Sequence, residues 1–178
     1  MEVHFLGLFF VVFLGWIPQS QAWKVAPTII DGVPDFFKFK PKPFEQIGDR
    51  YYYIETKIKS NWFEAYEECR RMNSSLVAFD SMEKYEQVHS RVKGSISFPK
   101  DYWTSGTSLS REGKFVWFST GHQIELNKWL EDVYPGGKEQ LCIELVVEKD
   151  GIGARSCFEP KAYICELRRP KTIVVVFY

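Results

Sequence analysis

Cysteine is the residue type in this sequence whose chemistry depends most on spacing. No Cys-x-x-Cys spacing occurs, and His89 and His122 are the only histidines beyond residue 22, so a structural zinc site is not expected. An even number of cysteines favours disulfides in an oxidising compartment, and four cysteines allow three pairings. The four are Cys69, Cys142, Cys157 and Cys165.

Side chains that could perform catalysis do not form a known motif. The sequence has no Gly-x-Ser-x-Gly, His-Glu-x-x-His, Walker or Gly-x-Gly-x-x-Gly motif. Cysteines committed to disulfides leave no free thiolate nucleophile. The 23 acidic residues contain no local pair that stands out as an acid and a base. We therefore expect that the protein is not an enzyme.

Composition indicates one globular domain. The chain has 178 residues, of which 45% are hydrophobic and 17% aromatic, and this is enough to bury a core. The 23 Lys and Arg residues balance the 23 Asp and Glu residues, so no whole-chain field attracts a polyanion. Nucleic acid is not an expected partner.

The first residues have the pattern of a secretory signal. An apolar run over 5–17 is shorter than the roughly 20 residues that span a bilayer, and a small-residue cleavage pattern ends at Ala22. We expect residues 1–22 to be a signal peptide, and the mature chain to be secreted, extracellular and without a membrane span. An uncleaved N-terminal anchor is the alternative, because residues 1–4 contain no Lys or Arg.

Two segments flank the expected domain. Prolines throughout residues 23–44 prevent a long helix, so this segment is expected to be an extended arm. The arm is interpreted as a solvated linker, with an anionic-ligand site on its alternating lysines as the alternative. Residues 168–178 have strong β-propensity and, if ordered, should add an edge strand or cover a neighbour's edge. Arm and tail are candidate contacts for homo- or hetero-oligomers.

Two helices are predicted in the first half of the chain. The first begins at Asn61, which has capping-box spacing with Glu64, and the second begins at Ser81 and ends at Gly94. His89 lies beside the inner face of the second helix and is expected to be a hydrogen-bonded histidine, not a metal ligand. The apolar faces consist of Trp62, Ala65, Tyr66, Cys69 and Met72, and of Tyr85, Val88 and Val92.

Short β-prone runs are the other regular elements predicted in the domain. One run precedes the first helix, and the others follow the second helix, separated by Gly, Ser, Asp and Pro. This order predicts an α+β fold in which two helices pack on mostly antiparallel sheets. The runs cover 51–56, 102–105, 115–118, 143–147 and 163–166.

Four features, taken in order, resemble those of a C-type lectin-like domain of the short, two-disulfide form. They are a Trp-x-x-Ala-x-x-x-Cys helix over 62–69, the segment WTSGTSL over 103–109, the turn over 115–121 with Trp129 beyond it, and YICE over 163–166. The Trp-Thr-Ser-Gly-Thr run is similar to that of secreted insect members. The resemblance covers residues 45–167 and implies the C-type lectin-like fold with a long loop region.

The resemblance also implies one of the three disulfide pairings. Cys69 would join Cys165 and close a long loop, and Cys142 would join Cys157 and close a short one. In the chain-entropy model these bonds contribute roughly 4 to 5 and about 3 kcal/mol.

Family members that bind sugar hold one Ca²⁺ with oxygen ligands from two places, and both places are altered here. A loop ahead of Cys142 has the sequence Tyr134-Pro135-Gly136, and the strand ahead of Cys157 has Ile152-Gly153-Ala154. These segments lack the carboxylate and amide side chains of the family pattern, which Ca²⁺ needs in number. Glu139 or Gln140 is a candidate for one further ligand. We expect no metal and no cofactor.

The resemblance implies a recognition protein for an extracellular glycan or glycoprotein, and we expect ligand binding without calcium. Tyr134 would supply stacking, and the other candidates hydrogen bonds. Glu148 and Asp150 are interpreted as parts of a solvated turn, not as compensating calcium ligands. The candidate ligand-binding residues are Tyr134, Glu139, Gln140, Lys149 and Arg155.

Two alternative functions stay open at this point. One is a Ca²⁺-dependent carbohydrate-binding lectin whose ligands lie elsewhere in the alignment. The other is a structural extracellular-matrix or assembly protein that uses the lectin-like domain as a scaffold. Asn73, in the sequon Asn73-Ser74-Ser75, is the candidate glycosylation site.

Overall fold

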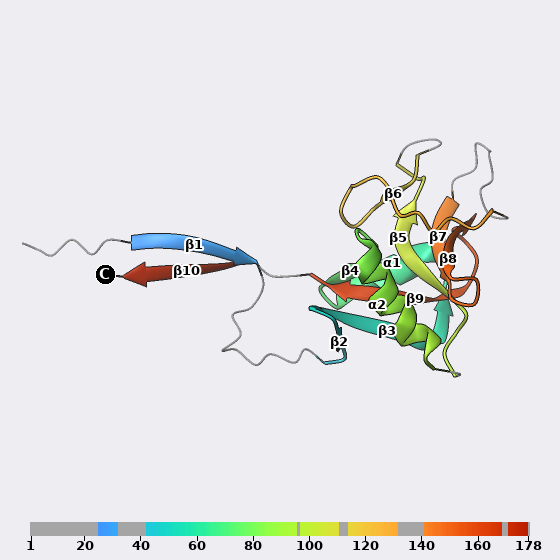
Figure 1. The fold of residues 1–178 in the computed structure, drawn as a ribbon, viewed down its shortest axis with the longest axis horizontal. Helices are drawn as coiled ribbons and strands as arrows, with labels where there is room; N and C mark the ends of the chain where they lie inside the picture. The colour runs from blue at the N-terminus through green and yellow to red at the C-terminus, as the bar shows by residue number, and fades with distance from the viewer. Residues whose placement is uncertain are drawn as a thin grey trace, which may run out of the picture.

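Figure 1 shows the computed structural model, which describes residues 25–31, 42–95, 97–110, 114–131, 141–168 and 171–177. Two helices and ten strands lie within these residues. In chain order they are β1 (Val25–Asp31), β2 (Glu45–Ile47), β3 (Arg50–Ser60), α1 (Trp62–Arg71), β4 (Ser74–Leu76), α2 (Met82–Lys93), β5 (Asp101–Thr107), β6 (Val116–Trp117), β7 (Leu141–Val146), β8 (Gly151–Ser156), β9 (Lys161–Leu167) and β10 (Lys171–Phe177).

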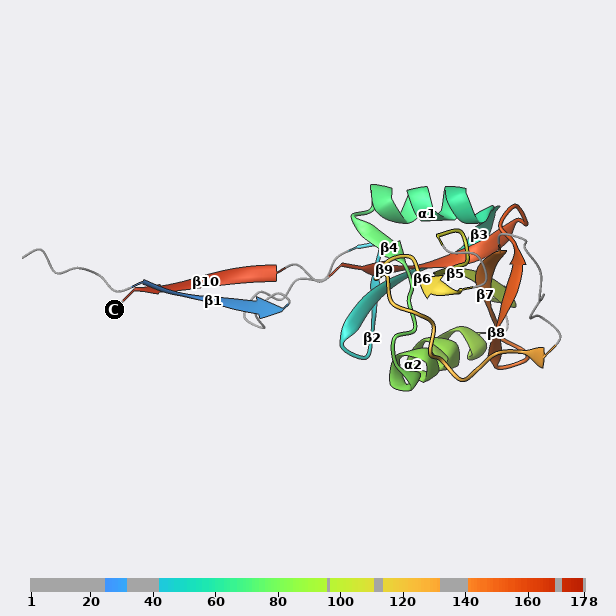
Figure 2. The same ribbon diagram turned by 90° about the horizontal axis from the view of Figure 1, so that it is seen from above.

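One mixed sheet organises the domain. Its strands lie in the order β2-β3-β9-β5-β7-β8, with β4 also pairing with β9 and β6 with β5. Among these pairs only β5 with β9 is parallel. Figure 2 shows α1 and α2 on opposite faces of the sheet. The predicted α+β fold, with two helices on a mostly antiparallel sheet, is therefore confirmed.

The first helix begins as its sequence predicts. The Asn61 side chain accepts a hydrogen bond from the Glu64 amide at 3.0 Å, and the Glu64 carboxylate accepts one from the Asn61 amide at 3.1 Å. These bonds complete a capping box. The Trp62 indole donates to the Thr104 carbonyl at 2.8 Å. The buried face therefore fastens α1 to β5; its fully buried residues are Trp62, Ala65 and Cys69.

The second helix also follows the prediction. Ser81 caps it by accepting a hydrogen bond from the Lys84 amide at 3.2 Å, and Gly94 is its C-cap. His89 is buried, and its ring lies 2.9 Å from the Val147 carbonyl, which is the hydrogen-bonded role expected for it. The apolar face contributes Tyr85, Val88 and Val92 to the core.

The observed strands differ from the predicted β-prone runs in length and number, because pairing with a neighbouring strand also determines where a strand forms. The runs at 51–56, 102–105, 143–147 and 163–166 lie largely within β3, β5, β7 and β9, whereas 115–118 gives only the two-residue β6. Neither β4 nor β8 was predicted from a β-prone run. β8 contains two glycines, yet it forms a strand because every one of its six residues pairs with β7.

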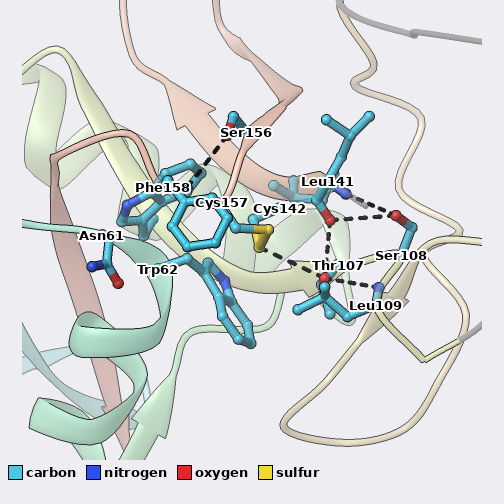
Figure 3. The surroundings of a disulfide bond; sticks show 12 residues. Asn61, Trp62, Thr107, Ser108, Leu109, Leu141, Cys142, Ser156, Cys157 and Phe158 are labelled. Atoms are coloured by element: carbon cyan, nitrogen blue, oxygen red, sulfur yellow. Dashed lines mark hydrogen bonds between the residues drawn. A yellow bond between two sulfur atoms is a disulfide. The ribbon is translucent and has the colours of Figure 1, made fainter. Parts of the chain in front are cut away.

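One disulfide links segments far apart in the chain, and the other links two neighbouring strands. Cys69 bonds to Cys165 across a sequence separation of 96, linking α1 to β9. Cys142 bonds to Cys157 across a separation of 15, linking β7 to the residue after β8. Figure 3 shows Trp62 next to this second bond, where its amide donates to the Cys157 carbonyl at 2.9 Å. The pairing is the one that the resemblance implied.

The arm and the tail contain a second, two-stranded sheet. β1 pairs antiparallel with β10, in a register that runs from Val25 opposite Phe177 to Asp31 opposite Lys171. In Figure 1 these strands lie side by side, away from the main sheet. The tail thus pairs with the arm and not with an edge of the main sheet. The expected signal peptide, residues 1–22, lies outside the described residues.

Candidate functional site

The β7–β8 hairpin carries the described part of the expected ligand surface. Its register pairs Cys142 with Arg155 near one end and Val146 with Gly151 at the turn. Lys149 is an exposed residue of that turn. The structure therefore places Lys149 and Arg155 at opposite ends of the hairpin and does not bring them together.

Arg155 is the described candidate that lies nearest in the fold to the start of β7. This strand begins at Leu141, which directly follows Gln140 in the sequence. The Arg155 side chain is 38% exposed, so part of it is accessible to a ligand. The remaining predicted ligand-binding residues lie outside the described residues; they are Tyr134, Glu139 and Gln140.

Two β8 positions that the resemblance assigns to calcium ligands carry no side-chain oxygen. Gly153 lies opposite Glu144, and Ala154 lies opposite Ile143 in the ladder with β7. Ala154 is 2% exposed and packs in the hydrophobic core. Because Ca²⁺ takes 6 to 8 oxygen ligands, several of them carboxylates, this strand contributes none of the charged side chains that such a site needs.

Glu144 is a buried acid held between two basic side chains. Its Oε1 lies 3.1 Å from Arg155 Nε, and its Oε2 lies 2.9 Å from Lys161 Nζ. Lys161 also pairs with Glu159 at 2.9 Å and lies 5.3 Å from the centre of the Trp103 ring. Burial raises the pKa of Glu144, and the hydrogen bond from Lys161 opposes that shift. Both oxygens of the Glu144 carboxylate are thus already paired with basic side chains, those of Arg155 and Lys161.

The acids of the β7–β8 turn are also bound to lysines. Lys100 Nζ lies 2.6 Å from Glu148, and Lys128 Nζ lies 2.8 Å from Asp150, which also accepts a hydrogen bond from the Tyr85 hydroxyl at 3.0 Å. Both carboxylates are about half exposed or more, as expected of a solvated turn. Within the part of the chain that the structure describes, no group of three or more His, Cys, Asp or Glu residues could hold a metal ion.

Asp150 should make the stability of the fold depend on pH. The hydrogen bond from Lys128 lowers the pKa of Asp150, against the effect of burial and with help from Tyr85 and His89. A carboxyl with a lowered folded-state pKa stabilises the protein above its unfolded pKa of about 3.9, and this contribution is lost as pH falls through the folded pKa. We expect Asp150→Asn to lower Tm near neutral pH and to have a shrinking effect below about pH 4.

Thermal melts of the wild type and of Asp150→Asn at a series of pH values check this expectation. Asparagine tolerates the left-handed backbone at this position, where φ is 51°, so the substitution does not add backbone strain. A Tm difference that stays constant down to pH values well below the unfolded pKa would contradict the proposed role of the charge.

An exposed aromatic patch lies beside α1 and was not predicted from the sequence. Phe63, Phe118 and Phe158 are 39%, 44% and 77% exposed. The Phe63 and Phe158 rings lie 5.6 Å apart, and the Tyr66 and Phe118 rings 5.4 Å apart. Trp62 lies beneath them, with its ring 5.6 Å from Phe63 and 5.9 Å from Phe118. The available sequence signal was Phe63, an aromatic residue off the buried stripe of its helix.

A polar pocket of about 200 Å³ lies between α2 and the first residues of β3. Beside it, Glu166 of β9 forms ion pairs of 2.6 Å with both Arg50 and Lys84. Lys84 also lies 3.5 Å from Asp80. These charges neutralise one another and tie α2 and β3 to β9, so the cluster has a structural role.

Comparison with known families decides the classification. The family model "Lectin C-type domain" matches residues 58–167, which is more than half of the chain. The chain belongs to the C-type lectin domain family. C-type lectin 37Da of Drosophila melanogaster is 30% identical to it over 182 aligned residues, with 95% of each chain covered.

Solved structures of C-type lectin domains share this fold. The mouse scavenger receptor C-type lectin carbohydrate-recognition domain superposes with a TM-score of 0.61 at 22% identity, covering 74% of this chain and 98% of that one. A calcium-independent type II antifreeze protein superposes with a TM-score of 0.63 at 17% identity, covering 74% of this chain and 96% of that one. At these identities the likeness shows the fold of the C-type lectin domain alone.

Proposed function

We propose that this C-type lectin domain protein is an extracellular recognition protein that binds a glycan or glycoprotein without calcium. The mouse scavenger receptor domain that shares this fold is named as a carbohydrate-recognition domain, and the C-type lectin family is generally not enzymatic. Extracellular placement is supported by the signal-like residues 1–22 and by two disulfides, which persist in oxidising compartments. Among the described residues, no helix is long and apolar enough to cross a membrane.

Calcium independence is supported mainly by the shortage of side-chain oxygens on and beside β8 that are free to bind an ion. Gly153 and Ala154 offer no side-chain oxygen, and Glu144 is already paired with Arg155 and Lys161. An ion that recruited Glu144 would take this buried carboxylate from Arg155 and leave Lys161 with the partly exposed Glu159, which is costly for the mostly buried lysine. Calcium affinity falls as charged ligands are removed, so a useful site is not expected here.

Ligand contacts are proposed on two surfaces. The first is Arg155, to which we add the sequence-predicted candidates Tyr134, Glu139 and Gln140, which lie outside the described residues; its chemistry would be hydrogen bonds and one aromatic ring. Lys149 would reach a ligand only if the ligand extends along the hairpin to its turn. The second surface is the aromatic patch, whose exposed rings offer stacking area; exposed apolar patches commonly mark binding sites.

Calcium titration gives the most direct test. We expect calorimetry of the oxidised chain to show no saturable Ca²⁺ binding below about 1 mM, and we expect the same Tm in calcium and in chelator. A C-type lectin with a complete ligand set, measured in the same buffers, controls for the assay. Saturable binding below that concentration, with a matching rise in Tm, would overturn the proposal.

A glycan and glycoprotein binding screen, run in calcium and in chelator, tests recognition itself. We expect the same ligands under both conditions and weaker binding by Arg155→Ala than by the control Arg71→Ala, an exposed arginine of α1. Phe158→Ala is compared with Ile58→Ala, since Ile58 is also largely exposed. Loss of binding in Phe158→Ala alone would assign the ligand to the aromatic patch. Binding only in calcium would establish the Ca²⁺-dependent alternative.

Asn73 is proposed as a glycosylation site. It is exposed after α1, and its φ of 54° is a conformation that asparagine adopts more readily than most residues. Intact-mass measurement before and after removal of N-linked glycans, with Asn73→Gln as the control, tests its occupancy.

A further inference from the structure

The two outer edges of the β1–β10 sheet differ because of one proline. Pro27 lies opposite Val175 in the register. In an antiparallel ladder, successive residues alternately direct their N–H and C=O groups toward the partner strand and away from it. Proline has no N–H to give, so it fits a regular ladder where its nitrogen faces away from the partner. Two directly opposed residues share this orientation. The backbone N–H and C=O of Val175 therefore point away from β1, toward the outer edge of β10.

Because this direction alternates along each strand, the residues whose N–H and C=O point to the outer edge can be identified. On β1 these outward positions include Pro27, so the outer edge of β1 lacks one N–H donor near its middle. On β10, the outward positions are Lys171, Ile173, Val175 and Phe177, and each has both an N–H and a C=O. Proteins protect sheet edges with proline, central charges or bulges. β10 has none of these beyond a lysine at its first residue.

The sheet as described leaves this open edge without a partner strand. Among the described residues, β1 and β10 pair only with each other. A two-stranded sheet is marginally stable in water by itself. Its sequences, VAPTIID and KTIVVVF, contain only one charged residue each, and these two face each other at one end of the register. Addition of strands at the β10 edge would supply the missing hydrogen bonds.

A second copy of β10 is complementary to that edge. An antiparallel arrangement centred on Val174 sets Lys171 opposite Phe177 of the second copy, and Ile173 opposite Val175 of the second copy. Outward residues then meet outward residues, as hydrogen-bonded pairs require. The two lysines lie at opposite ends, so no like charges are directly opposed. The same operation on the β1 edge would lose the bonds that both copies of Pro27 cannot donate.

We propose that two copies of this chain associate through their β10 edges, forming a four-stranded sheet in the order β1-β10-β10-β1. Such a contact is isologous, because both copies use the same surface about a twofold axis. The proposal does not depend on how the lectin domain binds its ligand.

Paired proline variants test which edge is used. Val175→Pro removes an outward N–H from β10 while leaving the inward bonds to β1 in place, and we expect it to be monomeric. Ile29→Pro is the matched control, because it adds a second proline at an outward position on the β1 edge, and we expect it to stay dimeric. Light scattering during size-exclusion chromatography of the full oxidised chain, produced in a secreting host, measures the mass of each; the wild type should have twice the mass of one chain.

Cysteine cross-linking tests the register. Val174→Cys lies on the twofold axis in a non-hydrogen-bonded pair, where Cα atoms are about 4.5 Å apart and within the range of a disulfide. We expect a covalent dimer from this variant under oxidation, and none from Thr28→Cys, which lies opposite Val174 on β1. A monomeric wild type, a dimer that survives Val175→Pro, or equal loss in both proline variants would overturn the proposal. So would a β10 edge that pairs only with a different protein, seen as a heterocomplex of an otherwise monomeric chain.

Discussion

Replacement of both Cys69 and Cys165 by alanine is expected to lower the free energy of unfolding by about 4 to 5 kcal/mol. The bond closes a loop with a sequence separation of 96, and breaking it returns the largest conformational freedom to the unfolded chain. Domains of this size are stable by only about 5 to 15 kcal/mol. The variant should therefore be largely unfolded at moderate urea, and equilibrium urea denaturation measures the change.

The matched comparison is replacement of both Cys142 and Cys157 by alanine. That bond closes a loop with a separation of only 15, and its loss should cost about 3 kcal/mol. All four cysteines are buried, so the packing lost with the sulfur atoms is similar in the two variants. If the short-loop variant is the less stable of the two, loop length does not set the contribution of these bonds.

Substitution of Glu144 by alanine is expected to destabilise the protein by about 3 kcal/mol. The change leaves Lys161, which is 12% exposed, with the partly exposed Glu159 in place of two carboxylate partners, and it leaves Arg155 without the carboxylate of Glu144. Removal of one member of a buried ion pair is more costly than the pair is favourable, because an uncompensated charge stays inside. The lower end of the usual range applies because Arg155 keeps part of its hydration. Urea denaturation again gives the value.

A second variant distinguishes loss of charge balance from loss of packing. Glu144→Leu combined with Lys161→Met removes both charges and keeps side chains of similar volume, so we expect it to recover much of the lost stability. The corresponding single variants complete a double-mutant cycle. Additive destabilisation in the double variant would show that the ion pair is not the source of the effect.

Helices were the most predictable elements, because their signals are local. Asn61 and Glu64 are three residues apart and form their capping box without help from the rest of the chain. β8 could not be recognised in the same way, since Gly151 and Gly153 weaken any β-prone pattern. It becomes a strand only when β7 lies beside it, and that depends on the tertiary fold.

The residue types at the candidate site could be taken from the sequence, whereas the arrangement of these residues could not. Gly153 and Ala154 have no side-chain oxygen in any conformation, so their contribution to a calcium site could be judged from the sequence. Lys149 and Arg155 are close in sequence, but β8 separates them. Arg155 lies four residues beyond Gly151, the first residue of β8, so at about 3.3 Å per residue the strand places it roughly 13 Å from the turn.

Tertiary contacts that join distant segments were not accessible from local patterns. Glu144 and Lys161 belong to different strands of the sheet, and their 2.9 Å contact requires the order β9-β5-β7 around Trp103. Phe158 follows a cysteine in a turn, and nothing near it in sequence indicates that it meets Phe63. The sequence gives the chemical type of each of these residues, but it does not indicate which residues they contact.

The Cys69–Cys165 bond also determines how the molecule would respond to tension applied at its two ends. A force applied to β1 and β10 would be transmitted through the Cys69–Cys165 bond. The chain between these two cysteines, which includes α2 and β5, would therefore bear no sustained force. Because the register places the ends of β1 and β10 together, such a pull opens this ladder one pair at a time, as a zipper. Extension is then limited to residues outside the closed loop, at no more than about 3.6 Å per residue, until the bond is reduced.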